Sequence, residues 1–172
     1  MIIYTVGHST HPLDEFLVLL QTHEIARIAD VRTVPKSRRH PHFSREALTQ
    51  SLPAAGVGYR HFGELGGLRK PRPDSRNVGW RHEGFRGYAD YMETPPFDRA
   101  IEDLLAWADQ GRTAVMCAEG VWWRCHRQLI ADALVARGVE TRHILSTGPA
   151  KPHAITEFAR IVGTRVTYPG LI

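Results

Sequence analysis

Both cysteines of this 172-residue chain lie in one stretch, TAVMCAEGVWWRCHRQLIADALVARG, at residues 113–138. The pattern predicts a buried strand that ends at Cys117 and a helix that starts near Cys125. Backbone N–H groups and the dipole at a helix start favour an anion or a thiolate. The alternative is that both cysteines are packed core residues. We therefore expect an anion site or an activated thiol, with both cysteines reduced and Cys125 the more reactive.

Two known kinds of cysteine site can be compared with this stretch. In phosphatases and rhodaneses, a cysteine after a strand is followed by a loop of backbone donors and an arginine that opens a helix. Here six residues separate Cys117 from Arg124, one more than usual, and the loop holds a single glycine. Cysteine-dependent phosphoryl or sulfur transfer remains an alternative. A metal site of Cys117, Cys125, His126 and His8 is disfavoured, because neither CxxC nor HxxxH spacing is present.

Five short runs rich in apolar and β-branched residues predict strands, and the segments between them have the spacing of amphipathic helices. The predicted strands are residues 1–6, 25–32, 57–62, 112–117 and 139–145. The predicted helices are residues 11–24, 45–56, 85–92, 95–108 and 124–138, with a last one from Pro152 through Val162. This alternation indicates right-handed crossovers and an α/β fold, a single three-layer domain over residues 1–172 with a largely parallel sheet flanked by helices.

The loops after three predicted strands have unusual compositions. They are GHST at residues 7–10, RTVPKSRRHPHFS at 32–44 and AEGVWWR at 118–124. Ligands of parallel sheets bind at the carboxyl ends of the strands, so these loops are expected at the binding edge. The residues predicted to line one cleft there are His8, Arg32, Cys117, Glu119 and Arg127.

Basic residues are concentrated in two loops that lie close to aromatic residues. The second of these, residues 63–84, has neither a helical nor a strand period, which is typical of a functional or mobile loop. Such a surface can follow a nucleic-acid backbone while aromatic rings stack on bases, or it can be an ordinary solvated surface. The basic residues are Arg32, Lys36, Arg38, Arg39, His40, His42, Arg45, Arg69, Lys70, Arg72, Arg76 and Arg81, and the aromatic ones are Trp80, Phe85, Trp122 and Trp123.

The composition is that of an ordinary globular domain that needs neither a disulfide nor a metal to fold. A net charge of +4 and a pI of about 9.4 are weak indications of an anionic partner. Two cysteines do not make a disulfide framework and fit a reducing compartment. No apolar run approaches the roughly 18 residues of a membrane span, and no basic segment precedes the first apolar residues. We therefore expect a cytoplasmic protein without a membrane partner, while cofactor and oligomeric state are left unspecified.

The order and spacing of several motifs resemble the family called domain of unknown function 488. The motifs are YTVGHST at residues 4–10, DVRTVPKSRRHPHFS at 30–44, LGGLR at 65–69, FRGYADYM at 85–92, MCAE at 116–119 and CHRQLIADAL at 125–134. This resemblance implies the fold and the location of the site, without the reaction. It implies roles for His8, Ser9, Asp30, Arg32, Cys117, Glu119, Cys125, His126 and Arg127. The segment 121–123 departs from the polar composition typical of the family there.

Three hypotheses from different classes follow. The first is an enzyme acting on a phosphorylated small molecule or nucleotide, whose anion Arg32 and Arg127 hold. The second is a non-catalytic nucleic-acid or nucleotide binding module, and the third is a metal or redox protein that uses the two cysteines. For the first, the catalytic residues are Glu119, His8, Cys117 and Cys125, and the ligand-binding residues are Ser9, Asp30, Arg32, Arg124, His126 and Arg127. It predicts that Arg127→Ala weakens phosphate binding more than about tenfold and leaves the melting temperature nearly unchanged.

Overall fold

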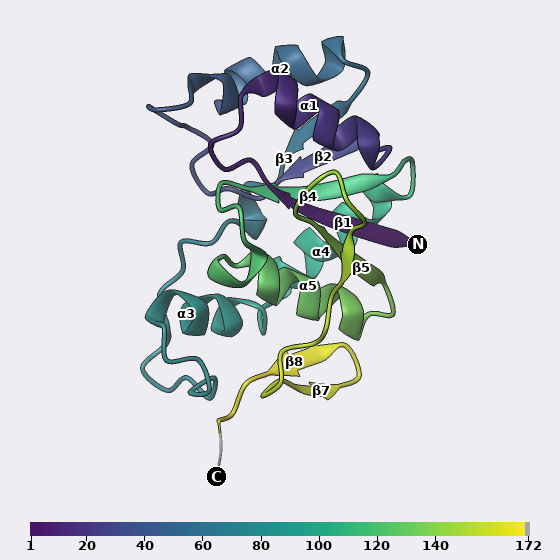
Figure 1. Ribbon diagram of the computed structural model, residues 1–172. Coiled ribbons are helices and arrows are strands. Elements are labelled where there is room, and N and C mark those ends of the chain that lie inside the picture. Colours follow the sequence, from purple (N-terminus) through teal and green to yellow (C-terminus); the bar gives the residue numbers. More distant parts are fainter. Residues whose placement is uncertain (171–172) are drawn as a thin grey trace.

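A six-stranded sheet forms the middle layer of the protein, with its strands in the order β3-β2-β4-β1-β5-β6 (Figure 1). The computed structural model describes residues 1–170. The first five strands in this order are parallel, and β6 pairs antiparallel with β5. The strands are β1 Ile2–Gly7, β2 Arg27–Asp30, β3 Gly58–His61, β4 Thr113–Cys117, β5 Glu140–Ile144 and β6 Lys151–Pro152. The predicted α/β fold with a largely parallel sheet is confirmed.

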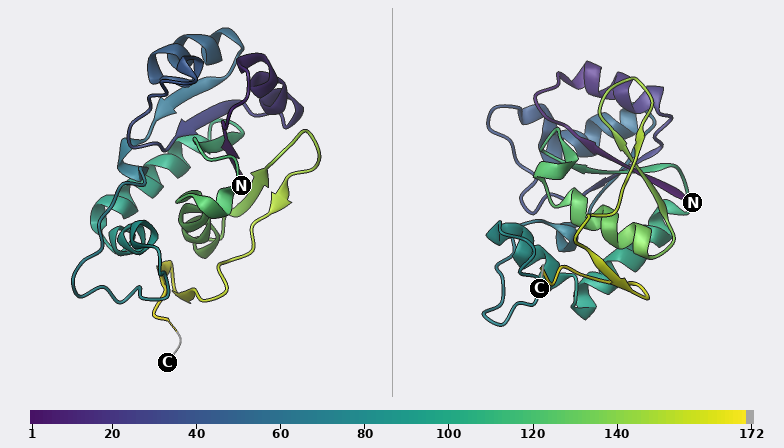
Figure 2. Two further views of the ribbon diagram at one scale, coloured as in Figure 1. Left: turned by 60° about the vertical axis from the view of Figure 1, so that its left-hand side comes forward. Right: turned by 60° about the horizontal axis from the view of Figure 1, so that its bottom comes forward.

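Helices cover both faces of this sheet, which gives three layers (Figures 1 and 2). One face is covered by α1 and α2, and the other by α3, α4 and α5. None of the helices in residues 1–170 is both long enough and apolar enough to cross a membrane. The remaining elements are α1 Leu13–Thr22, η1 Pro41–Phe43, α2 Arg45–Ala54, η2 Gly63–Leu65, α3 Glu83–Tyr91, α4 Pro95–Ala108, η3 Trp122–Arg124, α5 Arg127–Ala136, β7 Arg160–Val162 and β8 Arg165–Thr167.

The alternation of side chains along β4 decides which face of the sheet receives the first cysteine. Val115 and Cys117 belong to the core cluster on the side of α4 and α5, whereas Ala114 and Met116 belong to the cluster on the side of α1 and α2. Successive side chains of a strand point to opposite faces. Because Cys125 also packs in the α5-side cluster, the two cysteines lie on the same side of the sheet.

The segment after β5 forms strands, so the predicted helix from Pro152 through Val162 is wrong. Strand β6 extends the sheet, and β7 and β8 form a hairpin next to α5, drawn in yellow in Figure 1. Gly163 at the hairpin turn has a φ of +63°, a conformation that favours glycine. Val166 and Tyr168 pack in the core, whereas Val162 is 72% exposed. The spacing of the apolar residues between 155 and 162 fits one face of a helix. The β-branched residues on both sides of the Gly163 turn nevertheless favour the hairpin.

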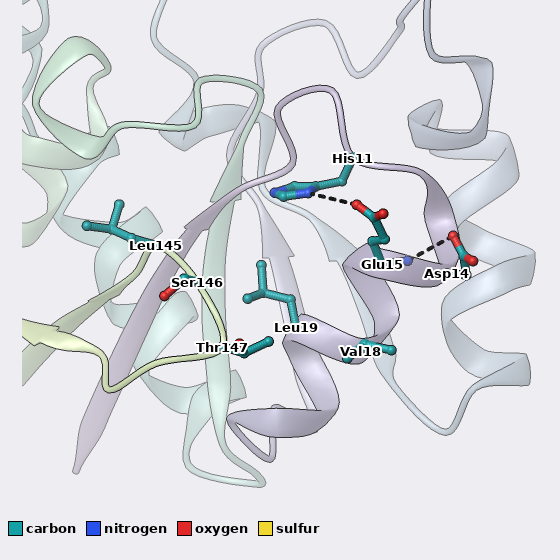
Figure 3. A pocket seen from close by; sticks show the side chains of 8 residues that line it. All are labelled: His11, Asp14, Glu15, Val18, Leu19, Leu145, Ser146 and Thr147. Carbon is teal, nitrogen blue, oxygen red and sulfur yellow. Dashed lines mark hydrogen bonds and ion pairs between the residues drawn. The ribbon is translucent and has the colours of Figure 1, made fainter.

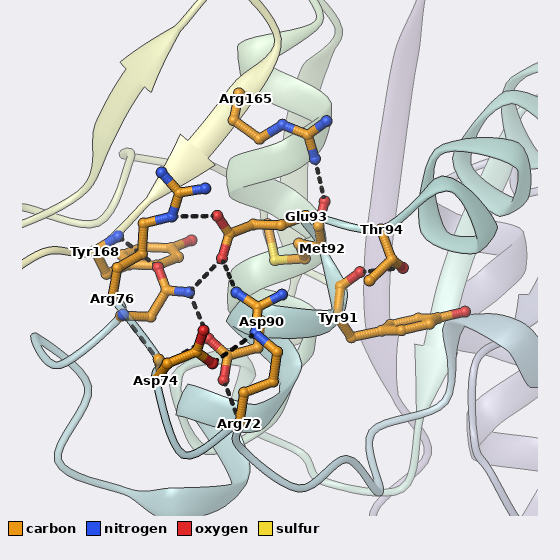
Figure 4. A network of polar contacts seen from close by, with 12 residues as sticks. Arg72, Asp74, Arg76, Asp90, Tyr91, Met92, Glu93, Thr94, Arg165 and Tyr168 are labelled. Carbon is orange, nitrogen blue, oxygen red and sulfur yellow. Dashed lines mark hydrogen bonds and ion pairs between the residues drawn. The ribbon is translucent and has the colours of Figure 1, made fainter.

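Two buried carboxylates, Asp90 in α3 and Glu93 just after it, hold the long loop between η2 and α3, which the sequence predicted to be functional or mobile (Figure 4). Asp90 accepts hydrogen bonds from the Ser75 hydroxyl at 2.6 Å, from the Asn77 amide at 2.7 Å and from the Arg72 backbone N–H at 2.8 Å. Burial opposes the charge on Asp90, but these hydrogen bonds keep its pKa below the ordinary value. Glu93 adds ion pairs with arginines of the loop. The loop is therefore tied to α3 along its length.

Candidate active site

The carboxyl ends of β1 and β4 lie side by side, and the chain leaves them toward opposite faces of the sheet. β1 leads to α1 on one face, and β4 leads to α5 on the other. Ligands of open α/β sheets bind at such a switch point. Beyond the strands, the His8 N–H donates to the carbonyl of Cys117 at 2.9 Å. A side chain at Gly7 would collide with the carbonyl of Glu119, so glycine allows the two loops to approach this closely.

The two cysteine sulfur atoms face each other at this edge. Their Sγ atoms are 2.7 Å apart, and the two residues are 3% and 8% exposed. Cys125 lies near the start of the helix, as predicted, but the helix begins at Arg127 instead of Arg124, and Cys125 itself is extended. The sulfur of Cys125 instead accepts the first N–H of the helix, from Arg127, at 3.3 Å. The helix start therefore still points a donor at this thiol.

Arg127 is fully buried, and its guanidinium points into the protein. Its Nε donates to the Sγ of Cys117 at 3.0 Å, and its Nη1 donates to the hydroxyl of Thr5 at 3.1 Å. Its Nη2 donates to the carbonyl of Glu119 at 2.6 Å. The side chain that was hypothesised to hold an external anion thus contacts a thiol, a hydroxyl and a carbonyl of the protein itself.

His126 lies on the other side of the thiol pair. Its Nε2 donates to the carbonyl of Val31 at 2.9 Å, which turns Nδ1 toward the thiol pair. Nδ1 is 3.6 Å from the Sγ of Cys125, within reach of its proton. A side chain at Gly67 would come within 2.6 Å of the same nitrogen. The second glycine of the LGGLR motif therefore lets the loop backbone cover this imidazole.

The two thiols differ in acidity although they touch. Burial and the hydrogen bond with Cys125 raise the pKa of Cys117 well above its ordinary value. Burial also opposes ionisation of Cys125, but the hydrogen bond with Cys117, the neighbouring His126 and the charge of Arg127 lower its pKa well below the ordinary value. Of the two thiols, Cys125 is therefore the one with the lower pKa.

A second buried cluster lies at the end of β2. The carboxylate of Asp30 accepts from the Nε and Nη2 of Arg32 at 2.9 and 2.7 Å and from the hydroxyl of Tyr59 at 2.5 Å. Arg32 also donates from Nη1 to the Nε2 of His8 at 3.3 Å. Burial, with the charge of Arg32, lowers the pKa of His8 to about 4. The guanidinium of Arg32 thus donates hydrogen bonds to both Asp30 and His8, and His8 accepts as a neutral imidazole.

Four of the predicted site residues are not fully buried. The side chains of Glu119 and Arg124 are exposed, and Ser9 and His126 are half-buried. Glu119 contributes to the site through its carbonyl, and Arg124 belongs to η3 instead of the helix. Ser9 has a φ of +49°, in the left-handed region, where its N–H donates to the carbonyl of Ala118. The structure thus brings the predicted residues to one sheet edge, in two packed clusters joined by the β1 and β4 loops.

A groove lies on the other side of the sheet, between α1 and the connection from β5 to β6 (Figure 3). It has a volume of about 390 Å³, and its apolar lining includes Val18, Leu19 and Leu145. His11 and Glu15 approach each other to 3.9 Å on its rim. Leu19 packs in the core cluster opposite to that of the cysteines, so this groove is separate from the thiol pair.

Five residues of the site were missed by reasoning from the sequence. One is Tyr59, which donates to Asp30. The other four are Thr5, Asp132, His143 and His153, which are connected to Arg127 through hydrogen bonds. One available signal was Asp132, a charged residue among the inward-facing positions of α5. Spacing could not connect the four, because they come from β1, α5, β5 and the segment after β6. Within residues 1–170, no three His, Cys, Asp or Glu side chains are grouped so that they could hold a metal ion.

The family can be assigned from the sequence between α1 and α5. Residues 12–134 match the family model described as domain of unknown function DUF488. The chain belongs to the DUF488 family. No curated protein and no solved structure gives a match. The matched region of this DUF488 protein contains Asp30, Arg32, both cysteines and Arg127, whereas His8, His143 and His153 lie outside it.

Proposed function

We propose that this DUF488 protein is a thiol–disulfide oxidoreductase, with Cys125 as the nucleophile and Cys117 as the resolving thiol. The observation that carries the proposal is the 2.7 Å separation of their sulfur atoms beside the guanidinium of Arg127. A disulfide bond is about 2.05 Å long, so the two sulfur atoms need to approach by well under an ångström. This is the third of the hypotheses formed from the sequence.

The burial of Arg127 supports a negative charge on sulfur. A buried cation is costly unless an opposite charge or strong acceptors compensate it. Within residues 1–170, Arg127 forms no ion pair with a carboxylate, and its other contacts are a hydroxyl and backbone carbonyls. The sulfur of Cys117, which Nε contacts, lies 2.7 Å from that of Cys125, so the guanidinium stabilises one negative charge on this pair of sulfur atoms. The site therefore favours the thiolate that disulfide exchange requires.

The reaction begins at Cys125, the more exposed and more acidic thiol. Its thiolate attacks one sulfur of a substrate disulfide, which breaks that bond and releases the other sulfur as a thiolate that takes up a proton. Cys117 then loses its proton, and the new thiolate, held by Arg127, attacks the sulfur of Cys125. The second substrate thiol leaves, so the substrate disulfide is reduced by two electrons while the protein acquires a Cys117–Cys125 disulfide.

The first hypothesis, an enzyme for a phosphorylated small molecule or nucleotide, is less well supported. Arg127 is buried against the protein, and Arg32 is paired with Asp30. Exposed cations at this edge include Arg124, Arg38 and their neighbours, which are free to meet an anionic ligand or a nucleic-acid backbone. A binding module of that kind would lose affinity steeply with salt, whereas disulfide exchange at Cys125 would persist.

The proposal is tested by incubating the protein in glutathione buffers of graded potential and measuring the intact mass. We expect the wild-type chain to lose two hydrogen atoms in a single transition. Cys117→Ser is expected to accumulate a mixed disulfide with glutathione on Cys125, because the resolving thiol is missing. Cys125→Ser is expected to react with oxidised glutathione at least about tenfold more slowly.

Arg124→Ala is the matched control, since this exposed arginine lies one residue before Cys125. It is expected to keep both the potential and the rate of the wild type. A wild-type chain that forms no internal disulfide at any potential would refute the proposal. Faster trapping of glutathione on Cys117 in Cys125→Ser than on Cys125 in Cys117→Ser would reverse the two roles.

A further inference from the structure

A chain of buried hydrogen bonds leads from Arg127 away from the thiols. Its Nη1 donates to the hydroxyl of Thr5 at 3.1 Å, and the hydroxyl is 2.6 Å from the Nδ1 of His143. The Nε2 of His143 is 2.8 Å from the Nδ1 of His153, whose Nε2 is 2.7 Å from the carboxylate of Asp132. Side chains that are linked by a hydrogen bond in this series come from different segments of the protein. Only the tertiary fold therefore brings these five side chains together.

The carboxylate end of this hydrogen-bond chain fixes the direction of the hydrogen bonds when both imidazoles are neutral. A carboxylate can only accept, so His153 donates to Asp132 from Nε2 and accepts on Nδ1 from the Nε2 of His143. The Nδ1 of His143 then accepts from the Thr5 hydroxyl, which accepts from Arg127 at the same time. Both neutral imidazoles therefore carry their proton on Nε2. Burial lowers the pKa of His143 to about 3, in agreement with a neutral ring.

The far end of the chain is a fully buried carboxylate with several donors. Asp132 also accepts from the backbone N–H of Thr156 at 3.0 Å and from the hydroxyl of Tyr168 at 2.7 Å. Midway, the ring of Trp122 stacks on His143 with centroids 4.2 Å apart and planes inclined by 4°. These contacts leave the imidazole of His143 little freedom to turn. A change at Asp132 therefore alters the hydrogen bonds at each step up to Arg127.

We propose that Thr5, His143, His153 and Asp132 are positioning residues that tie Arg127 to a remote carboxylate and so control the charge that Arg127 offers to the thiol pair. Asp132 shares the positive charge of Arg127 through the aligned hydrogen bonds. The thiol pair and the carboxylate therefore compete for one guanidinium. This inference rests on the proposed function for its purpose, but the competition itself can be measured without disulfide exchange.

A double-mutant cycle on the acidity of Cys125 tests the competition. Alkylation by iodoacetamide is measured against pH in the Cys117→Ser background, so that a single thiol titrates. Asp132→Asn keeps the shape and removes the negative charge, and we expect it to lower the thiol pKa by about 0.5 or more, a threefold change in the thiolate-to-thiol ratio. In combination with Thr5→Val, which removes the connecting hydroxyl, the effect of Asp132→Asn is expected to fall to less than half.

Thr113→Val provides the matched control for the connecting hydroxyl. Thr113 is a buried threonine of the adjacent strand, and its hydroxyl donates to the carbonyl of Gly111, outside the chain. The effect of Asp132→Asn is expected to persist in full in this background. An equal effect with and without Thr5→Val would overturn the inference, as would no effect of Asp132→Asn.

The unaltered protein gives a second, independent test. Side-chain nitrogen NMR distinguishes the two neutral forms of histidine, and we expect the Nε2–H form for both His143 and His153 at neutral pH. A protonated ring or an Nδ1–H form at either position would overturn the inference even where variants fail to fold. If instead the chain behaves as expected but no internal disulfide forms, the proposed function fails while the positioning role stands.

Discussion

Arg127→Ala separates the role seen in the structure from the role predicted from the sequence. The substitution removes a fully buried side chain and leaves its acceptors, the Thr5 hydroxyl, the Glu119 carbonyl and the Cys117 sulfur, without their donor. Breaking a buried charged interaction of this kind costs about 3–5 kcal/mol. For a chain of this size the melting temperature is then expected to fall by about 6–20 °C. If Arg127 only held an external anion, its replacement by alanine would leave the melting temperature nearly unchanged.

The free energy of unfolding can be measured by urea denaturation, followed by tryptophan fluorescence. Arg124→Ala again serves as the control, because that exposed side chain is expected to change stability by less than about 0.5 kcal/mol. Phosphate binding is measured in parallel by calorimetry. A variant Arg127→Ala with wild-type stability and phosphate affinity reduced more than about tenfold would refute the internal role and restore the anion-binding hypothesis.

Three further predictions concern the neighbourhood of the thiols. Gly67→Ala places a methyl group 2.6 Å from the Nδ1 of His126, so the ring must move. Alkylation of Cys125 is then expected to slow several-fold at neutral pH, and an unchanged rate would contradict the role of this imidazole. Burial lowers the pKa of His8 to about 4 from an ordinary 6.5, so the unfolded chain binds more protons between these pH values and the free energy of unfolding is expected to rise with pH there. His8→Phe is expected to weaken this pH dependence in urea titrations at graded pH, and an unaltered slope would contradict the role of His8. Asp30→Asn leaves the buried Arg32 without its counter-charge and is expected to lower the free energy of unfolding by about 3–5 kcal/mol in the same denaturation assay. A loss under about 1 kcal/mol would show that the ion pair does not stabilise this end of β2.

The location of the site could be predicted from the sequence because it depends on local patterns. Runs of β-branched and apolar residues alternate with amphipathic helices, and this alternation is enough to indicate a parallel sheet. The carboxyl ends of β1, β2 and β4 then had to meet at one edge. His8, Arg32 and Cys117 follow directly from that rule, as does the proximity of Cys125, because the loop from β4 to α5 is short.

The partners of the charged groups could not be predicted in the same way. Arg127 stands beside Cys125 in the sequence, in a segment that suggested an anion site, yet its guanidinium turns inward to Cys117 and Thr5. Asp132 lies within the CHRQLIADAL motif but received no role from the sequence, although it ends the hydrogen-bond chain that starts at Arg127. The segment from Pro152 to Val162, which ends in β7, was wrongly predicted as a helix, because a few apolar residues satisfy the helical period without a helix forming.

The sequence by itself thus determined the α/β fold and the sheet edge that carries the two thiols, because strand and helix periods are set by neighbouring residues. Only the tertiary structure decided which thiol faces the arginine and how the distant carboxylate is connected to it. The physical reason is burial. Inside the protein each donor must find an acceptor among the groups that the fold brings within about 3 Å, and for Arg127 those groups come from β1, β4 and the loop after β4.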